Sequence, residues 1–528
     1  MKLERLIESL CQPRAYAHSP LDVEVRQTHI SVVFLAGAFA YKIKKPVEMG
    51  FLDFRTLDRR RHFCEEEVRL NRRLAPSVYL GVVPITWERG RAVVEGNGEP
   101  IEWAVKMLRL PDDATLEKRL EQGKLDSART KDLAGKIAWF HARADRSERI
   151  SQVGRFNVIA GNARENFEQA LPEVGRTVCS AVFQRLRNLN ERNLDRLRPV
   201  IESRADRHLP CDTHGDLHLD HVYLFPDRSP PDDLVIIDCI EFNDRFRFAD
   251  PVADMAFLAM DLKFHGRPDL ARVFANKYFE AAGDSEGREL LSFYTAYRAI
   301  VRAKVEGFEL REPEIPEVEK SRALARSRAH WLLALEEFEE PRRRPCLLLI
   351  GGLPGSGKTT LARRLTEAGD FVVLRSDVLR KELAGLSPEA RASAQFREGL
   401  YAPEWTERTY DECLRRAGDL LFEGHRVIVD ASFREDVYRQ RFLEAATGWG
   451  VPAIWLDCQA EPEVIRRRLQ LRRGDASDAD WKIYEAAAAH WDPPGVKTAR
   501  AGHAINTEGS IQEMTDAAID VLRSQGLF

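Results

Sequence analysis

The chain has 528 residues, more than one hydrophobic core supports, and this length predicts about two to four domains. A net charge of −4 with 31% charged residues argues against wholesale binding of nucleic acid or of anionic membranes. The eight cysteines contain no C-x-x-C pair, which favours reduced thiols over a disulfide framework. We find no secretory leader and no apolar run of about 18 residues, and therefore expect a soluble, cytoplasmic protein without a membrane partner.

The first predicted elements form a β-hairpin. Residues 28–34 alternate polar and apolar side chains, a turn follows at Gly37, and residues 39–44 resume the strand pattern. Because side chains alternate between the two faces of a strand, Lys42 and Lys44 project to the same face. The hairpin therefore presents two ammonium groups on one side of a sheet.

Three further segments precede the middle of the chain. Residues 64–74 have the spacing of a helix, and Glu67 lies inside its apolar stripe, where a carboxylate is unexpected. Residues 103–108 have the pattern of an extended segment. A helix predicted at 132–144 carries His141 among apolar residues, and we expect a core histidine there rather than a catalytic one.

A run of histidines and aspartates at 214–221 is the next informative stretch. A strand predicted at 234–237 follows it and ends at Asp238. Asp216 in a tight loop and Asp238 at a strand end suit phosphoryl transfer, in which one carboxylate accepts a hydroxyl proton and the other holds Mg²⁺. A second interpretation stays open, because clustered histidines and aspartates also bind zinc or iron. Its residues are His214, His218, His221 and Asp238.

Three motifs of this half resemble the aminoglycoside phosphotransferase and choline kinase families. They are H-G-D-L-H at 214–218, I-D at 237–238 and the run from Asp250 to Asp254-Met255-Ala256, and the similarity covers about residues 25–310. The resemblance implies a bilobal, protein-kinase-like α+β domain over residues 1–340, with an N-lobe at about 20–110 and a helical C-lobe at about 111–340. It also implies the roles of six residues, which are Asp216 as catalytic base, Asp238 as metal ligand, Lys42 as phosphate-binding lysine, Glu67 as its helical partner, Met107 at the hinge that meets adenine, and Asp254 as a structural brace.

The sequence departs from this family pattern in two places. His221 stands where the family has an asparagine, although an imidazole can also bind the metal. No glycine-rich loop precedes Lys42, which we prefer to Lys44 because of its spacing from Ala40. A kinase-like domain that binds nucleotide without catalysis is therefore an open alternative.

Prolines mark the boundary between the two halves. Residues 311–316 break the chain, a charged helical segment follows, and the sequence P-R-R-R-P at 341–345 precedes the next strand. We expect the second domain at 341–528.

The most specific motif is a glycine-rich loop between a strand and a helix. Residues 346–350 are apolar, residues 352–359 read G-L-P-G-S-G-K-T, and residues 361–365 have a helical pattern. In this context G-x-x-x-x-G-K-[ST] indicates a P-loop, whose backbone N–H groups, lysine and hydroxyl hold nucleotide phosphates and Mg²⁺. The predicted nucleotide-binding residues are Gly352, Gly355, Ser356, Gly357, Lys358, Thr359 and Thr360.

Acidic residues follow the next two predicted strands. Asp377 and Arg380 come after the strand at 371–374, where they suit an acceptor-side base and a phosphate contact. Asp430 ends the strand at 427–429, the place of a Walker B-like acid close to Mg²⁺.

An arginine-rich helix at 466–473 completes the candidate site. We expect Arg468 and Arg472 to contact the transferring phosphoryl group from a lid, where fixed positive charge offsets the charge of the transition state. A solvated helix or an RNA contact are the alternatives for this helix.

The second half resembles the small P-loop kinases grouped with zeta toxin, polynucleotide 5′-hydroxyl kinase and gluconate kinase, over about residues 345–525. The resemblance implies a P-loop NTPase fold with a doubly wound parallel sheet, Asp377 as base, Arg380 as acceptor contact, and a lid carrying Arg468 and Arg472. The whole chain resembles bacterial proteins described as bifunctional aminoglycoside phosphotransferase/ATP-binding proteins.

We therefore predict an α/β protein with two kinase-type sites that use ATP and Mg²⁺ to phosphorylate hydroxyl groups of small polar molecules. Two other classes stay open, a nucleotide-dependent regulator with an ATPase switch and a nucleic-acid end kinase. The sequence indicates neither the acceptor nor the oligomeric state.

Overall fold

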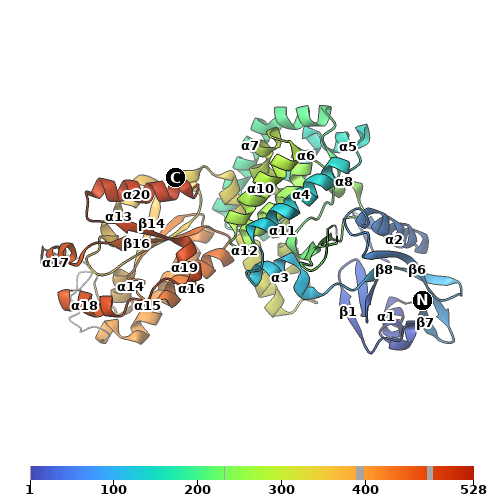
Figure 1. Cartoon of the computed structure of the whole chain (residues 1–528), viewed down its shortest axis with the longest axis horizontal. Coiled ribbons are helices and arrows are strands. Elements are labelled where there is room, and N and C mark those ends of the chain that lie inside the picture. Colours follow the sequence, from blue (N-terminus) through green and yellow to red (C-terminus); the bar gives the residue numbers. More distant parts are fainter. Residues whose placement is uncertain (1, 51, 231, 388–397, 472–479) are drawn as a thin grey trace. The chain divides into compact units, whose positions relative to one another are not determined.

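The computed structural model describes residues 2–50, 52–230, 232–387, 398–471 and 480–528 (Figure 1). The chain forms two compact units, one of Met1–Gly161 and Leu197–Tyr294, the other of Asn162–Arg196 and Thr295–Phe528. Each unit draws on two stretches of the chain, and the domain boundary near residue 340 stays a prediction. Among the described helices, none combines the length and the hydropathy that a membrane-spanning helix needs.

An antiparallel sheet of six strands, in the order β1-β2-β3-β8-β6-β7, forms the N-terminal part of the first unit. The predicted hairpin is the pair β2 and β3, in which Val33 lies opposite Lys42. The strands are β1 (Val23–Gln27), β2 (Ser31–Ala36), β3 (Phe39–Lys44), β6 (Tyr79–Glu88), β7 (Arg91–Val94) and β8 (Pro100–Leu108).

Helices cover both faces of this sheet. On one face α2 (Leu57–Asn71) packs Cys64 and Val68 against Ala40, while on the other α1 (Leu3–Leu10) packs against Phe34. Lys42 and Lys44 share the face of Ala40 because the side-chain period of a strand is two. Both lysines therefore point toward α2.

The remainder of the first unit is mainly helical, with short strands between the helices. Helices α6 (Phe156–Ala170), α7 (Ser180–Asp206) and α11 (Leu291–Glu309) contribute residues to both units. The other elements are β4 (Glu48–Met49), β5 (Leu52–Asp53), α3 (Leu116–Glu121), α4 (Ser127–Arg143), α5 (Glu148–Val153), β9 (Cys211–Asp212), β10 (Val222–Leu224), β11 (Leu234–Ile236), α8 (Asp244–Arg247), β12 (Phe248–Ala249), α9 (Pro251–Phe264) and α10 (Pro268–Ala282).

His141 of α4 is the core histidine that the sequence predicts. Its side chain is buried, with Nδ1 2.7 Å from the Tyr278 hydroxyl and Nε2 3.1 Å from the Asp254 carboxylate. Both ring nitrogens therefore have polar partners inside the helical core.

The second unit contains a five-stranded sheet in the order β14-β15-β13-β16-β17, with every pair parallel. Its strands are β13 (Leu347–Gly351), β14 (Phe371–Arg375), β15 (Arg426–Asp430), β16 (Ala453–Gln459) and β17 (Gly502–Asn506). Its helices are α12 (Glu317–Phe338), α13 (Lys358–Gly369), α14 (Ser376–Leu383), α15 (Pro403–Phe422), α16 (Asp436–Gly448), α17 (Pro462–Leu471), α18 (Trp481–Ala489), α19 (Val496–Ala501) and α20 (Ile511–Ser524).

The parallel sheet is buried on both faces. Leu347 and Leu349 of β13 pack with residues of α15 and α16, and the alternating Leu348 and Ile350 pack with residues of α13 and α20. The predicted doubly wound parallel sheet is thereby confirmed. Since parallel strands end at one edge, the loops after β13, β14 and β15 meet there and build the candidate site.

Candidate functional site

The loop between β13 and α13 has a backbone that only glycines fit. Gly352 and Gly355 have φ of +136° and +80°, and Gly357 caps α13 at +95°. A Cβ on Gly352 would lie 2.5 Å from the carbonyl oxygen of Cys458. The loop therefore exposes backbone N–H groups at the positive end of α13, which is the arrangement that binds phosphate.

Replacing Gly352 by Ala is expected to destabilise the second unit by at least about 1–3 kcal/mol, because the new Cβ combines a disfavoured φ with a backbone clash. Urea unfolding measures the loss. The matched control is Gly448→Ala in α16, where an added Cβ meets nothing within 4 Å and φ is not positive. We expect the control to be neutral or slightly stabilising, and equal losses in the two variants would contradict the strain argument.

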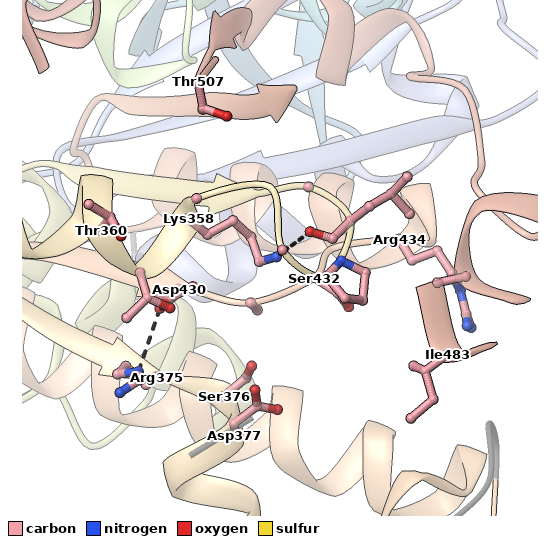
Figure 2. A pocket seen from close by; sticks show the side chains of 18 of the residues that line it. Lys358, Thr360, Arg375, Ser376, Asp377, Asp430, Ser432, Arg434, Ile483 and Thr507 are labelled. Carbon is pink, nitrogen blue, oxygen red and sulfur yellow. Dashed lines mark hydrogen bonds and ion pairs between the residues drawn. The ribbon is translucent and has the colours of Figure 1, made fainter. Parts of the chain in front are cut away.

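The acid that ends β15, Asp430, lies near the P-loop lysine, Lys358 (Figure 2). The Thr359 hydroxyl donates to Asp430 Oδ2 at 2.7 Å, and Arg375 Nε lies 3.6 Å from the same oxygen. Lys358 Nζ donates to the carbonyl oxygen of Leu353 at 2.8 Å within its own loop. Burial raises the pKa of Asp430, and the Lys358 ammonium and the Thr359 hydroxyl oppose that rise.

Arg468 of α17 reaches the P-loop through a threonine that sequence reasoning missed. Its guanidinium donates to the Thr507 hydroxyl oxygen at 3.2 Å, and that hydroxyl donates to the carbonyl oxygen of Ser356 at 2.8 Å. The loop after β17 is thus tied to the P-loop. No sequence motif around Thr507 predicts this contact. It depends on the position of β17 in the sheet, which places Thr507 at this edge. Arg472, the second predicted lid residue, lies outside the described residues.

A cavity of about 600 Å³ joins the P-loop to the predicted acceptor side. Asp377 in the first turn of α14 and Arg380 one turn later both line it, as do Thr360 and Arg468. Aromatic residues that the sequence did not single out line the same wall. They include Tyr410 and Tyr438, whose rings stack with centroids 4.2 Å apart.

Arg380 is a buried cation of this cavity. Its residue is 7% exposed, its guanidinium donates to the Leu400 carbonyl oxygen at 3.2 Å, and it lies over the Tyr401 ring at 4.7 Å from the ring centroid. Among the described residues, no carboxylate oxygen is recorded within 4.0 Å of it. The guanidinium gives this wall of the cavity a positive charge, which suits an anionic or strongly polar ligand.

In the first unit Glu67 lies between the two lysines of β3. Its carboxylate is 2.9 Å from Lys42 Nζ and 2.8 Å from Lys44 Nζ. Lys42 is also paired with Asp238 at 2.5 Å, and Lys44 with Glu241. Burial works against the charge of every member, yet the two ammonium groups hold the pKa of Glu67 below its usual value. The structure thus joins Lys42, Glu67 and Asp238, while Glu241 was missed because no spacing indicates it.

The loop that carries Asp216 is held by Asp254. The carboxylate of Asp254 accepts the backbone N–H groups of His214 and Gly215 at 3.0 and 2.9 Å. His214 Nε2 lies 2.9 Å from the Ile237 carbonyl oxygen, which connects this loop to the segment before Asp238. These contacts agree with a bracing role for Asp254. They also place the loop of residues 214–221 close to Asp238.

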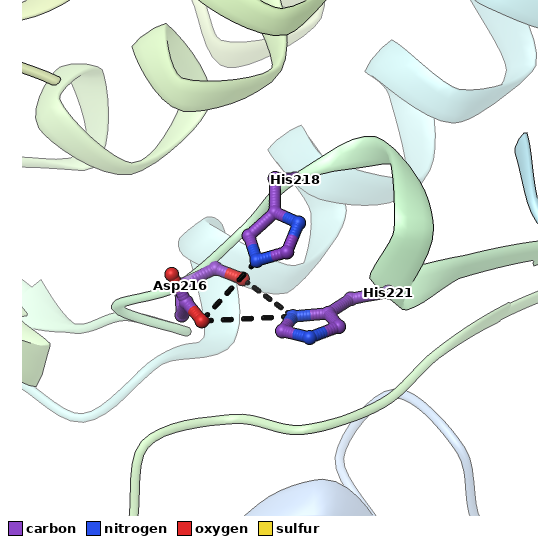
Figure 3. Close-up of side chains that lie close together, drawn as sticks. All are labelled: Asp216, His218 and His221. Carbon is purple, nitrogen blue, oxygen red and sulfur yellow. Dashed lines mark hydrogen bonds and ion pairs between the residues drawn. The ribbon is translucent and has the colours of Figure 1, made fainter. Parts of the chain in front are cut away.

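Asp216, His218 and His221 form a cluster in this loop (Figure 3). Asp216 Oδ2 lies 3.3 Å from His218 Nε2 and 3.8 Å from His221 Nδ1. His221 Nε2 is 3.7 Å from Asp238 Oδ2. The predicted base and the two predicted metal ligands are therefore neighbours in space.

Met107 lies near the end of β8, opposite both Ala40 and Tyr79. The following N–H groups are already used in the sheet region, since Leu108 N donates to the carbonyl oxygen of Val78 and Arg109 N to that of Ala38. A nucleotide at this edge would therefore meet other backbone groups than these two.

The two candidate sites offer different donors to a metal ion. At the P-loop, the Thr359 hydroxyl and the Asp430 carboxylate supply oxygen atoms only, which fits Mg²⁺. In the first unit, Asp238 supplies oxygen and His221 a ring nitrogen, a mixed set that Mg²⁺ does not favour.

Comparisons with known proteins give one family match within the second unit and relatives over nearly the whole chain. Residues 347–494 match the family described as "AAA domain". Over 522 residues the chain is 32% identical to uncharacterized proteins of Mycobacterium bovis and of two Mycobacterium tuberculosis strains, a match covering 98% of this chain and 98% of each relative. Among solved structures, a gluconokinase from Sinorhizobium meliloti is 17% identical, with a TM-score of 0.26 over 35% of this chain and 95% of that one. A sugar kinase from a Janibacter species is 16% identical, with a TM-score of 0.26 over 34% of this chain and 94% of that one.

Proposed function

The chain belongs to the same family as these mycobacterial proteins, and we propose that it is an ATP-dependent kinase acting on hydroxyl groups of small polar molecules. The carrying observation is the cavity in which a P-loop, the carboxylate of Asp377 and the guanidinium of Arg380 face one space. Nucleotide phosphates and an acceptor hydroxyl fit the two ends of such a cavity, and phosphoryl transfer needs mainly their alignment.

In the proposed reaction the acceptor oxygen bonds to the γ-phosphorus, and the bond from that phosphorus to the β–γ bridging oxygen breaks. The electron pair of the broken bond leaves with ADP, and Asp377 accepts the hydroxyl proton. Lys358 and Arg468 offset the negative charge that spreads over the transferring group. Mg²⁺, when bound, neutralises phosphate charge, and the residues that would hold it are Thr359 and Asp430.

The first unit is proposed as a second phosphotransfer site. Lys42, paired with Glu67, would contact nucleotide phosphates, Asp216 would orient the acceptor hydroxyl, and Asp238 would bind the metal. The ion pairs that join Lys42 to Glu67 and to Asp238 support this proposal. Met107 would lie at the hinge, where a nucleotide would meet backbone groups other than the N–H groups of Leu108 and Arg109, which have partners in the sheet region.

Transfer of labelled γ-phosphate from ATP into a fractionated small-molecule extract tests both sites. Wild type, Asp216→Asn and Lys358→Ala are compared in parallel. A labelled metabolite that disappears with one variant only assigns that reaction to one unit. Release of free phosphate alone, abolished only by Lys358→Ala, would contradict the kinase proposal and favour a nucleotide-dependent regulator.

Replacing Arg380 by Met is expected to raise the KM for the acceptor about 10- to 100-fold with a smaller change in kcat, because a charged hydrogen bond to the ligand is lost. The unfolding temperature should not fall, because no ion pair of the described residues is broken. Steady-state kinetics with the labelled acceptor and a thermal melt give both readouts. Arg415→Met, which removes an exposed guanidinium beside Glu412, is the control. An unchanged KM in the Arg380 variant would exclude an acceptor contact.

A further inference from the structure

From the cluster in the first unit we infer that Asp216, His218 and His221 bind a divalent first-row transition metal, such as Mn²⁺, Co²⁺ or Zn²⁺, in preference to Mg²⁺ (Figure 3). Each residue offers one ligand atom, and these atoms lie within 4.8 Å of one another. The inference stands on geometry and donor chemistry, and it holds whether or not the first unit transfers phosphate.

The spacing of the donors suits an ion among them. A metal with bonds of about 2.0–2.2 Å to nitrogen and oxygen places neighbouring ligand atoms roughly 3–3.5 Å apart. Asp216 Oδ2 lies 3.3 Å from His218 Nε2 and 3.8 Å from His221 Nδ1. Asp238 lies on the far side of His221, 3.7 Å from its Nε2, and is outside this ligand set. Small side-chain movements would therefore complete the site.

The contacts of the two rings match those of histidines that bind metal. A metal-binding histidine commonly donates its second N–H to a carboxylate or a backbone carbonyl, which fixes the tautomer and the ring orientation. His218 Nδ1 contacts the Asp220 carboxylate, and its Nε2 faces Asp216. His221 faces the Asp216 carboxylate with Nδ1, at 3.8 Å, and its Nε2 lies 3.7 Å from the Asp238 carboxylate. Nδ1 is therefore the ligand atom that His221 offers, and a bound ion would replace its 2.9 Å contact with the Asp216 carbonyl oxygen.

The donor set decides which ion is preferred. Mg²⁺ keeps oxygen ligands and water, whereas imidazole nitrogens favour Mn²⁺ to Zn²⁺. Two imidazoles beside carboxylates therefore select a transition metal.

The test uses the untagged full chain, stripped with a chelator and kept free of nucleotide. Co²⁺ is titrated and followed by its visible d–d absorption, and Zn²⁺ and Mg²⁺ are added as competitors. We expect one Co²⁺ per chain at this site, displaced by micromolar Zn²⁺ and retained in millimolar Mg²⁺. His221→Asn and His218→Asn should each weaken Co²⁺ binding about 10- to 100-fold. His425→Asn, at a half-exposed histidine beside Glu423, is the matched control and should bind as wild type.

Thermal melts are a second measurement, and they also show whether the variants fold. Metal-free melts should show the variants folded, and Co²⁺ should raise the unfolding temperature of wild type and of His425→Asn only. Two results would overturn the inference: Co²⁺ binding no tighter than Mg²⁺ binding, or unchanged affinity in both cluster variants. Either result would indicate that the contacts of His218 with the carboxylates of Asp216 and Asp220 serve the loop without a metal.

Discussion

Asp377→Asn is expected to lower phosphate transfer by the second unit about 10²- to 10⁴-fold while leaving nucleotide affinity within a factor of two. The substitution keeps the size and the hydrogen-bonding reach of the side chain, but an amide cannot accept the hydroxyl proton. Asp377 lines the cavity from the first turn of α14 (Figure 2). Transfer is measured with labelled ATP, and nucleotide binding by calorimetry.

The control for this experiment is Asp419→Asn, an exposed carboxylate of α15 that pairs with Arg415. It should keep the wild-type rate. Retention of more than a tenth of the transfer rate by Asp377→Asn would remove Asp377 as the base. Loss of nucleotide binding together with transfer would instead indicate that the substitution disturbs the cavity.

Lys44→Met is expected to destabilise the first unit by about 3–5 kcal/mol, because it leaves the buried carboxylate of Glu241 without its partner. Lys44 and Glu241 are 1% and 8% exposed, so water cannot replace the lost contact. Burial would lower the pKa of the Lys44 ammonium, but the carboxylates of Glu241 and Glu67 raise it above its usual value. The lysine is therefore charged in the folded protein, and its pairing is an electrostatic requirement of this core.

Urea unfolding of a double-mutant cycle separates the pair from its surroundings. Lys44→Met combined with Glu241→Gln should be much less destabilised than the sum of the two single variants, since no buried charge of this pair remains unpaired. Lys118→Met is the control, because Lys118 forms an exposed pair with Glu121 and should change stability by less than about 0.5 kcal/mol. Additive single and double losses would contradict the coupling of Lys44 to Glu241.

The sequence by itself determined those features whose functional residues and local backbone structure both follow from a short stretch of chain. The P-loop is readable because its glycines need backbone angles that other residues avoid, and because Lys358 and Thr359 follow at a fixed spacing. Asp430 is likewise predicted, because it ends a buried parallel strand, which is the place of a Walker B-like acid. The hairpin of β2 and β3 follows from alternation alone, which also places Lys42 and Lys44 on one face.

Pairings between distant segments were decided only by the tertiary structure. Glu67 was expected beside Lys42, yet it bridges both lysines, and Glu241 completes the set from about 200 residues away. Thr507 reaches the P-loop only because β17 lies next to β16 in the sheet. Periodicity states which face of an element is apolar but not which other element it contacts.

The course of the helices shows the same limit. Trp331 of α12 packs with Phe167 and Phe183, so residues of α6 and α7 belong to the compact second unit together with the P-loop sheet. A helical pattern predicts that such side chains are buried, and the choice of partner depends on shape and packing over the whole core. Sequence thus determined the P-loop and its nearest acids, because the motif is short and its residue types are chemically constrained. Tertiary structure decided the buried charges and the cavity wall, because their energies depend on contacts between segments far apart in the chain.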